Sequence, residues 1–244
     1  MQEILYATCM GFVAGVLGTA LGGIIAAGTK MKEKRAVSFV MEFSAGLMLA
    51  LVCLDLLPEA FYLSNVTMVG TGILLGSVTV VFLQNVIKFA LPDIINNPSA
   101  KTGLLLALGV SIHNFPEGLA IGSSLDLSPQ VGLSIAAVIA LHNMPEGLAL
   151  SLPLRAGGYQ KLKIILISVL AGLPMAFGSF VGAAVGSLSD SLISLCLGFA
   201  SGAILYIVCE DIIPESKKIH CGRFSTLGNM IGIITGIIVS LLST

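Results

Sequence analysis

The sequence predicts an all-α integral membrane protein with eight transmembrane helices, and its composition and the lengths of its apolar runs carry that prediction. Of the 244 residues, 56% are hydrophobic and 10% are charged, with a mean hydropathy of +1.01. Soluble domains carry about 25% charged residues, so this chain cannot cover a water-facing surface. We therefore expect a single transmembrane domain over residues 1–244, with the lipid bilayer as its surroundings.

Eight apolar runs are long enough to span a bilayer core, which takes about 20 residues per helix. The first is expected to stay as a helix, because Met1-Gln2-Glu3 lacks the basic start of a cleaved signal. The five cysteines form no Cys-x-x-Cys pair, so we expect no disulfide framework. A net charge of −1 gives no reason to expect a nucleic-acid partner. The predicted spans are residues 4–28, 37–61, 66–89, 102–124, 130–153, 163–187, 191–214 and 225–243.

The positive charges indicate how these spans are oriented. All 12 lysines and arginines lie in or beside the connections that follow the first, third, fifth and seventh spans. The alternate connections and both termini have none. Since Lys and Arg concentrate in the cytoplasmic loops of membrane proteins, we expect these four connections in the cytoplasm, both termini outside, and the protein in the cell membrane.

Two internal repeats organise the chain. The segments His113–Ala120 and His142–Ala149 share the pattern His-Asn-x-Pro-Glu-Gly-Leu-Ala, on the fourth and fifth spans. Segments Ala45–Glu59 and Ser201–Glu215 match on the second and seventh spans, which cross the membrane in opposite directions. Spans one to three and six to eight are therefore predicted to form an inverted repeat around a central hairpin, an arrangement typical of transporters.

The shared motif carries the chemistry of a metal site. In each copy a His and a Glu lie four residues apart, on one helix face, and an Asn borders that face. A carboxylate at the bilayer centre costs about 2.5–3.5 kcal/mol, and a divalent cation bound by imidazole and carboxylate groups would compensate for two of them. The candidate metal ligands are His113, Asn114, Glu117, His142, Asn143 and Glu146.

The motif prolines favour the same location. Pro116 removes the donor for the Ile112 carbonyl, and Pro145 does so for Leu141. In lipid, a freed carbonyl must be satisfied by protein, water or an ion. We expect a kink and a polar spot on the turn that carries each His and Asn.

These two motifs, the eight spans and the Leu-Pro-Glu and Ile-Pro-Glu ends of spans two and seven resemble the ZIP (Zrt-, Irt-like protein) metal transporters, and most of all the bacterial GufA and ZupT type. The resemblance implies that the six motif residues bind the transported ion. It implies uptake of Zn²⁺ into the cytoplasm by alternating access, with Fe²⁺, Mn²⁺ or Cd²⁺ as further cargo. It implies no enzymatic activity and no cofactor, and a movement of spans one, four, five and six against the others.

One departure from the family pattern concerns a second metal position. Bacterial relatives carry Gly-Leu-x-Glu-Pro-Leu-Gly on the sixth span, where the Glu completes that position. Residues 172–178 instead read Gly-Leu-Pro-Met-Ala-Phe-Gly, which places Met175 where the Glu is expected. Because a thioether is a poor Zn²⁺ ligand, we expect a weak or missing second position.

Polar residues on spans two and seven suggest a route for the ion. By resemblance to the family, Asp55 and Glu210 are expected to be stations where the ion enters and leaves, as the inverted repeat also suggests. Cys209, beside Glu210, is either a weak transient ligand or a packing residue. Some, such as Glu59, can equally mark helix ends in the membrane interface. The candidates are Asp55 and Glu59 toward the outer end, and Cys209, Glu210 and Asp211 toward the inner end.

Two other function classes stay open at this stage. An intramembrane metalloenzyme would use similar ligands, but zinc proteases use His-Glu-x-x-His, and here no glutamate is left to act as a base. A haem-binding electron carrier could use His113 and His142 as axial ligands, yet it would not need the matched glutamates and prolines. A homodimer also stays open.

Overall fold

The computed structural model describes residues 2–28, 34–90, 97–186 and 189–243, apart from some side chains in these ranges, among them that of His113. Within this described part, eight helical spans are long and apolar enough to cross a membrane. This confirms the predicted all-α membrane fold. In chain order the elements are α1 (Gln2–Phe12), η1 (Val13–Leu17), α2 (Gly18–Gly28), α3 (Lys34–Leu51), η2 (Val52–Leu56), α4 (Leu57–Leu63), α5 (Val66–Ala90), α6 (Pro98–Leu127), α7 (Pro129–Ala156), α8 (Lys161–Gly186), α9 (Asp190–Ile207), η3 (Val208–Ile212), α10 (Ile213–Ile219) and α11 (Arg223–Ser243).

Polar caps and prolines fix where several spans begin. The Asn97 side chain accepts a hydrogen bond from the Ala100 backbone N–H at 3.1 Å, directly before Pro98 at the start of α6. The Ser189 hydroxyl accepts from the Leu192 N–H at 3.3 Å at the start of α9. Such caps satisfy N–H groups that have no partner within the helix.

Three spans contain a π-helical turn within the described ranges, and two of these turns are related by the internal repeat. Residues of the second repeat lie 156 positions after their counterparts, as 45 and 201 do. The turns η2 (Val52–Leu56) and η3 (Val208–Ile212) have the same offset. The third, η1, lies in the first span. Single π turns inside helices frequently occur at functional sites, and η2 and η3 carry Asp55, Cys209, Glu210 and Asp211.

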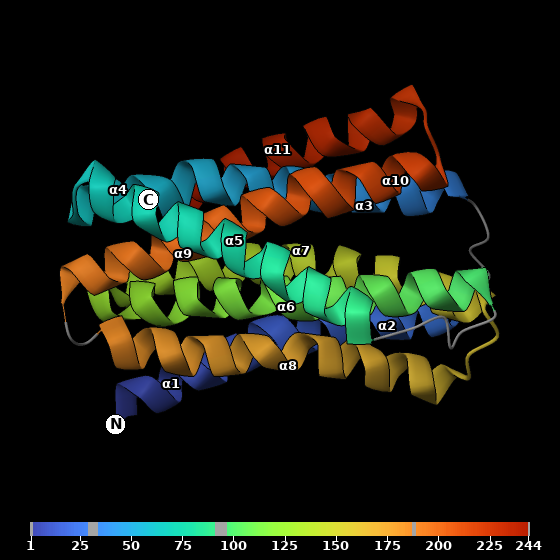
Figure 1. Cartoon of the computed structure of the whole chain (residues 1–244), viewed down its shortest axis with the longest axis horizontal. Helices are drawn as coiled ribbons and strands as arrows, with labels where there is room; N and C mark the ends of the chain where they lie inside the picture. The colour runs from blue at the N-terminus through green and yellow to red at the C-terminus, as the bar shows by residue number, and fades with distance from the viewer. Residues whose placement is uncertain (1, 29–33, 91–96, 187–188, 244) are drawn as a thin grey trace.

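The spans pack as two bundles. The motif bundle consists of α1, η1, α2, α6, α7 and α8, with α6 packed on α7 and α8, and α2 on α7. The companion bundle consists of α3, η2, α4, α5, α9, η3, α10 and α11, with α3 packed on α11 and α5 on α9. In Figure 1, α3 and α11 lie above α6 and α7, while α1 and α8 lie below them. The bundles meet where α3 contacts α7 and α9 contacts α6.

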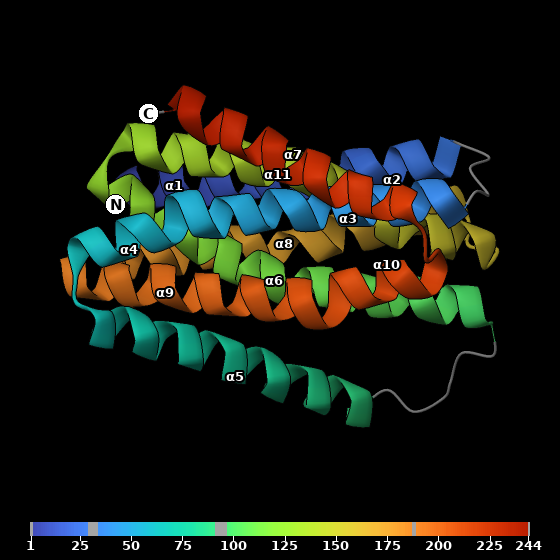
Figure 2. The same cartoon turned by 90° about the horizontal axis from the view of Figure 1, so that it is seen from above.

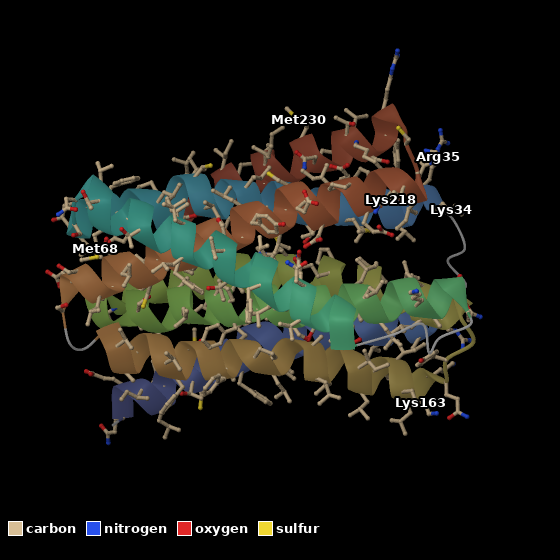
Figure 3. The ribbon with its side chains drawn as sticks, viewed as in Figure 1. Lys34, Arg35, Met68, Lys163, Lys218 and Met230 are labelled. Carbon is tan, nitrogen blue, oxygen red and sulfur yellow. The ribbon has the colours of Figure 1, made fainter. Side chains whose placement is uncertain are left out.

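The two ends of the molecule differ in charge. Lys34, Arg35, Lys163 and Lys218 lie at one end (Figure 3), which we call the basic end. Both the N-terminal and the C-terminal helix ends lie at the opposite end of the molecule (Figures 1 and 2). This arrangement is the one that an even number of spans requires.

Hydrogen bonds of the companion bundle repeat the internal symmetry. The Ser38 hydroxyl on α3 donates to the Ser216 carbonyl on α10 at 3.0 Å. Its counterpart Ser194, on α9, donates to the carbonyl of Ala60 on α4 at 2.9 Å. All four residues follow the 156-residue offset, so this part of the predicted inverted repeat is present in the contacts as well as in the sequence.

Candidate metal site

The central hairpin brings the two motifs face to face. Glu117 on α6 and His142 on α7 are both fully buried, and His142 Nε2 lies 2.9 Å from Glu117 Oε1. Both residues lie within the membrane-spanning parts of their helices. A buried carboxylate that contacts an imidazole nitrogen is a donor set that suits a divalent transition metal.

The two asparagines are held with their amide oxygens free. Asn114 Nδ2 donates to the Ala171 carbonyl on α8 at 2.7 Å. Asn143 Nδ2 donates to the Ala14 carbonyl at 3.0 Å, and Ala14 belongs to the π-helical turn η1. Since both amide nitrogens are used by backbone carbonyls, the oxygens are the atoms left to act on a ligand.

Three buried oxygen atoms at the motifs have no hydrogen-bond partner within the described part of the chain: Asn114 Oδ1, Asn143 Oδ1 and Glu117 Oε2. Leaving a buried acceptor unsatisfied costs about 1–3 kcal/mol, and more for a charged group. Buried polar groups in folded proteins are nearly always paired. Each of the three is an electron-pair donor, which is what a cation requires of its ligands.

The side chain of His113 lies outside the described residues, although its backbone is part of α6. Without it, no group of three or more His, Cys, Asp and Glu side chains that could hold a metal ion occurs among the described residues. The other five predicted ligands are all buried, with Glu146 the most exposed at 4%.

Glu146 opens onto a cavity of about 350 Å³ that extends toward the basic end. Ser44 and Met41 of α3 line it beside Glu146, and Glu215 and Lys218 of α10 line its far end. The cavity thus runs along the boundary between the two bundles, from the candidate site to the surface at the basic end.

The predicted pathway residues divide between the two ends. Glu210 and Asp211 line the cavity, whereas Cys209 is exposed and absent from its lining. Asp55 Oδ1 accepts from Ser240 Oγ at 2.9 Å, and neither Asp55 nor Glu59 lines the cavity.

The inverted repeat shows that the site is open on one side. The two motif helices are related by an offset of 29 residues, as 113 and 142 are, and the companion bundle by 156. The 18 cavity-lining residues have 18 counterparts by these offsets. Nine of these counterparts are at most 2% exposed and belong to one apolar cluster, whereas others, such as Leu54, Tyr62 and Leu141, are exposed. We call the nine buried counterparts the plug: Leu51, Leu56, Ala120, Ile121, Ile135, Val138, Ile139, Leu197 and Ala200. Residues that line an open cavity on the basic side therefore have counterparts in a buried apolar core on the opposite side.

Met175 lies at the second motif. Its side chain is fully buried, and its sulfur is 3.7 Å from Asn143 Nδ2. The methionine therefore lies on one flank of the candidate site, against the second motif.

Several polar residues of the site and its cavity were not predicted from the sequence. Ser44 donates to Glu146 Oε1 at 3.2 Å, and Gln84 Nε2 donates to Asp211 Oδ2. Glu42, 2% exposed, pairs with Lys217 Nζ at 2.9 Å. Two of these residues could have been found from the sequence, because Glu42 and Ser44 interrupt the apolar run of the second span.

The chain is similar in sequence to known zinc transporters. The profile described as ZIP zinc transporter matches residues 98–244. A zinc transporter named ZupT from Chlorobium chlorochromatii is 30% identical over 270 aligned positions, covering 100% of this chain and 99% of that protein. Zinc transporter ZIPB from Bordetella bronchiseptica is 30% identical over 91% of this chain and 77% of its own length. Zinc transporter GufA from Myxococcus xanthus is 35% identical over 142 residues, 58% of this chain and 56% of that protein.

Proposed function

Because the chain belongs to the ZIP family of zinc transporters, we propose that it carries Zn²⁺ through the membrane between the two motif helices. Membership in this family identifies a multi-pass membrane protein that transports a metal ion and is not an enzyme. The metalloenzyme and the haem carrier are therefore set aside.

In this proposal the ion is held by the six motif residues His113, Asn114, Glu117, His142, Asn143 and Glu146. The observation that carries it is the group of three buried oxygens without a hydrogen-bond partner, on Asn114, Glu117 and Asn143. A divalent ion gives each of them a partner and balances the two motif carboxylates. Fe²⁺, Mn²⁺ and Cd²⁺ accept the same nitrogen and oxygen ligands and are proposed as further cargo.

The proposed direction is from the opposite end to the basic end, which is uptake into the cytoplasm if the basic end is cytoplasmic. The ion would pass Asp55 and Glu59, bind at the motifs, and leave past Glu210 and Asp211, which line the cavity. Access would alternate when the motif bundle moves against the companion bundle, closing the cavity and opening the plug. The division of the helices into two packed bundles supports this movement.

The test is reconstitution of the purified protein in liposomes and measurement of Zn²⁺ flux with a trapped fluorescent indicator. Zinc flux that saturates with concentration is expected, and a panel of the other three metals ranks the cargo. Repeating the assay with an imposed proton gradient identifies the driving force. Absence of saturable flux of any divalent metal would contradict the proposal.

A further inference from the structure

Ser44 connects the two bundles at the candidate site. It lies on α3 in the companion bundle and is 1% exposed. Its hydroxyl lies 3.2 Å from Glu146 Oε1 and 3.4 Å from the backbone carbonyl of His142, both on α7. One small side chain therefore contacts a predicted metal ligand and the backbone of another.

This contact joins the two bundles. Other interhelical hydrogen bonds and ion pairs of the described residues stay within one bundle. Examples are Asn143 with Ala14 in the motif bundle and Glu42 with Lys217 in the companion bundle. Ser44 thus provides a polar contact across the boundary between the two bundles.

The inverted repeat provides this hydroxyl on one side only. The counterpart of Ser44 in the second repeat is Ala200, which is fully buried in the plug. The counterpart of Glu146 is Glu117. After the motif bundle moves to open the plug, Ala200 would occupy the equivalent place near Glu117, and alanine has no donor for that carboxylate.

We propose that Ser44 is a positioning residue that orients Glu146 and latches the motif bundle in the arrangement that opens the site toward the basic end. The inference rests on the proposed function, because it takes Glu146 as a metal ligand and the bundles as the moving parts. A hydrogen bond weakens steeply beyond about 3.5 Å, so a shift between the bundles breaks the latch. The repeat offers no equivalent bond in the other arrangement.

Loss of the latch should change the balance between the two arrangements. A hydrogen bond to a charged group contributes enough to change an equilibrium constant about tenfold. Removing the Ser44 hydroxyl should therefore raise the population with an open plug about tenfold relative to the population with an open cavity. A bond changes the ratio of two populations only through the difference between its free energy in one arrangement and its free energy in the other.

The experiment places a reporter thiol in the plug. Val138 is 1% exposed, and its counterpart Gly109 lines the open cavity, so Val138→Cys should react with a polar thiol reagent when the plug opens. The five native cysteines are first replaced by alanine or serine. Measurement in detergent makes the result independent of membrane orientation. If opening is rare and fast, the modification rate is proportional to the open population.

Ser44→Ala should raise the rate at Val138→Cys about tenfold, and Ser44→Thr, which keeps a hydroxyl, should return it toward the original value. The matched control is Ser201→Ala, because Ser201 is a buried serine that donates within its own helix to Leu197 at 2.7 Å. It should leave the rate unchanged. A second reporter, Ala183→Cys, lies inside the motif bundle at 1% exposure and should stay protected in every variant.

An unchanged modification rate of Val138→Cys in the Ser44→Ala variant would overturn the latch. Equal acceleration at Val138→Cys and Ala183→Cys would also overturn it, because it would indicate a general loosening of the fold. Failure of threonine to restore the rate would show that the hydroxyl is not the responsible group. Zinc flux of Glu146→Ala separates the two proposals. Retained flux in that variant contradicts the proposed site, whereas lost flux with an unchanged Ser44→Ala rate contradicts the latch alone.

Discussion

At the scale of single residues, the candidate site contains polar and ionisable groups whose burial costs free energy unless each has a binding partner. Glu117 is fully buried, yet its Oε2 has no hydrogen-bond partner among the described residues. On the protein surface, water would hydrate a carboxylate oxygen that has no hydrogen-bond partner in the protein. The pairing of His142 with Glu117 keeps two ligand types together while leaving an oxygen free.

Replacement of a motif ligand should therefore abolish transport and leave the fold intact. Glu117→Ala or His142→Ala is expected to reduce Zn²⁺ flux in liposomes to the level of empty liposomes, because each removes a donor atom. The matched control is Glu3→Ala, which removes an exposed carboxylate at the start of α1. Flux near that of the unaltered protein in either variant, at equal amounts of reconstituted protein, would show that the ion binds elsewhere.

Met175 sets the expected number of bound ions. Two divalent ions side by side repel strongly in a low-dielectric site, and the buried methionine beside Asn143 adds no charge. We expect one tightly held Zn²⁺ per chain in the core after extensive dialysis. Met175→Glu should raise this value toward two.

The measurement is metal content per chain, paired with anomalous scattering at the zinc edge to locate each ion. Met175→Leu is the control, because it keeps the volume without adding a carboxylate. Two equally occupied core positions in the unaltered protein would contradict the charge argument.

At the scale of the elements, glycines let the spans approach closely. A Cβ on Gly22 would lie 2.2 Å from the Met144 carbonyl oxygen and 2.4 Å from the Leu148 nitrogen of α7. These are backbone atoms that cannot move without shifting the helix. Small residues at helix contacts are the ordinary basis of packing in membranes, and this accounts for a glycine at position 22.

Gly22→Ala should therefore destabilise the protein by about 1–3 kcal/mol, as overpacking does in other tightly packed cores. The measurement is the midpoint of thermal unfolding in detergent. Gly28→Ala on the same helix is the matched control, since its Cβ would meet no atom within 4 Å. Equal midpoints for both variants would show that α2 and α7 are not in the close contact described.

The inverted repeat is the element-scale feature that the sequence predicted with most detail. The pairs Asp55 with Ser240 and Asp211 with Gln84 follow the same 156-residue offset. The sequence pointed to the two aspartates but not to their partners, because Ser240 and Gln84 differ in type and share no local pattern. Their equivalence becomes visible through the fold.

At the scale of the whole molecule, charge distinguishes the two ends, and this makes the orientation testable. In a cysteine-free background, Lys163→Cys at the basic end should resist an impermeant thiol reagent added to intact cells. Thr67→Cys, exposed near the start of α5 at the opposite end, should react. Both should react after the cells are opened.

Efficient modification of Lys163→Cys in intact cells would reverse the proposed orientation and the direction of uptake with it. The same reagent applied to right-side-out vesicles provides a second reading. Because the arrangement of helices is unaffected by orientation, this result would leave the site and the latch in place.

The sequence by itself determined the number of spans and the residues most worth testing. Each span is an apolar run of sufficient length, and lipid forces such a run to satisfy its own backbone as a helix. The matched motifs named Asn114, Glu117, His142, Asn143 and Glu146, all of which are buried in the fold. These features are local, so a short stretch of sequence contains the information.

Only the tertiary structure decided which side of the site is open and which residue reaches Glu146 from the other bundle. The repeat gives both halves nearly the same local pattern, so sequence alone favours neither arrangement. The choice depends on contacts between segments far apart in the chain, such as Ser44 with Glu146, and on apolar packing summed over the plug. Such contacts have no local signature, because they exist only after the two bundles have come together.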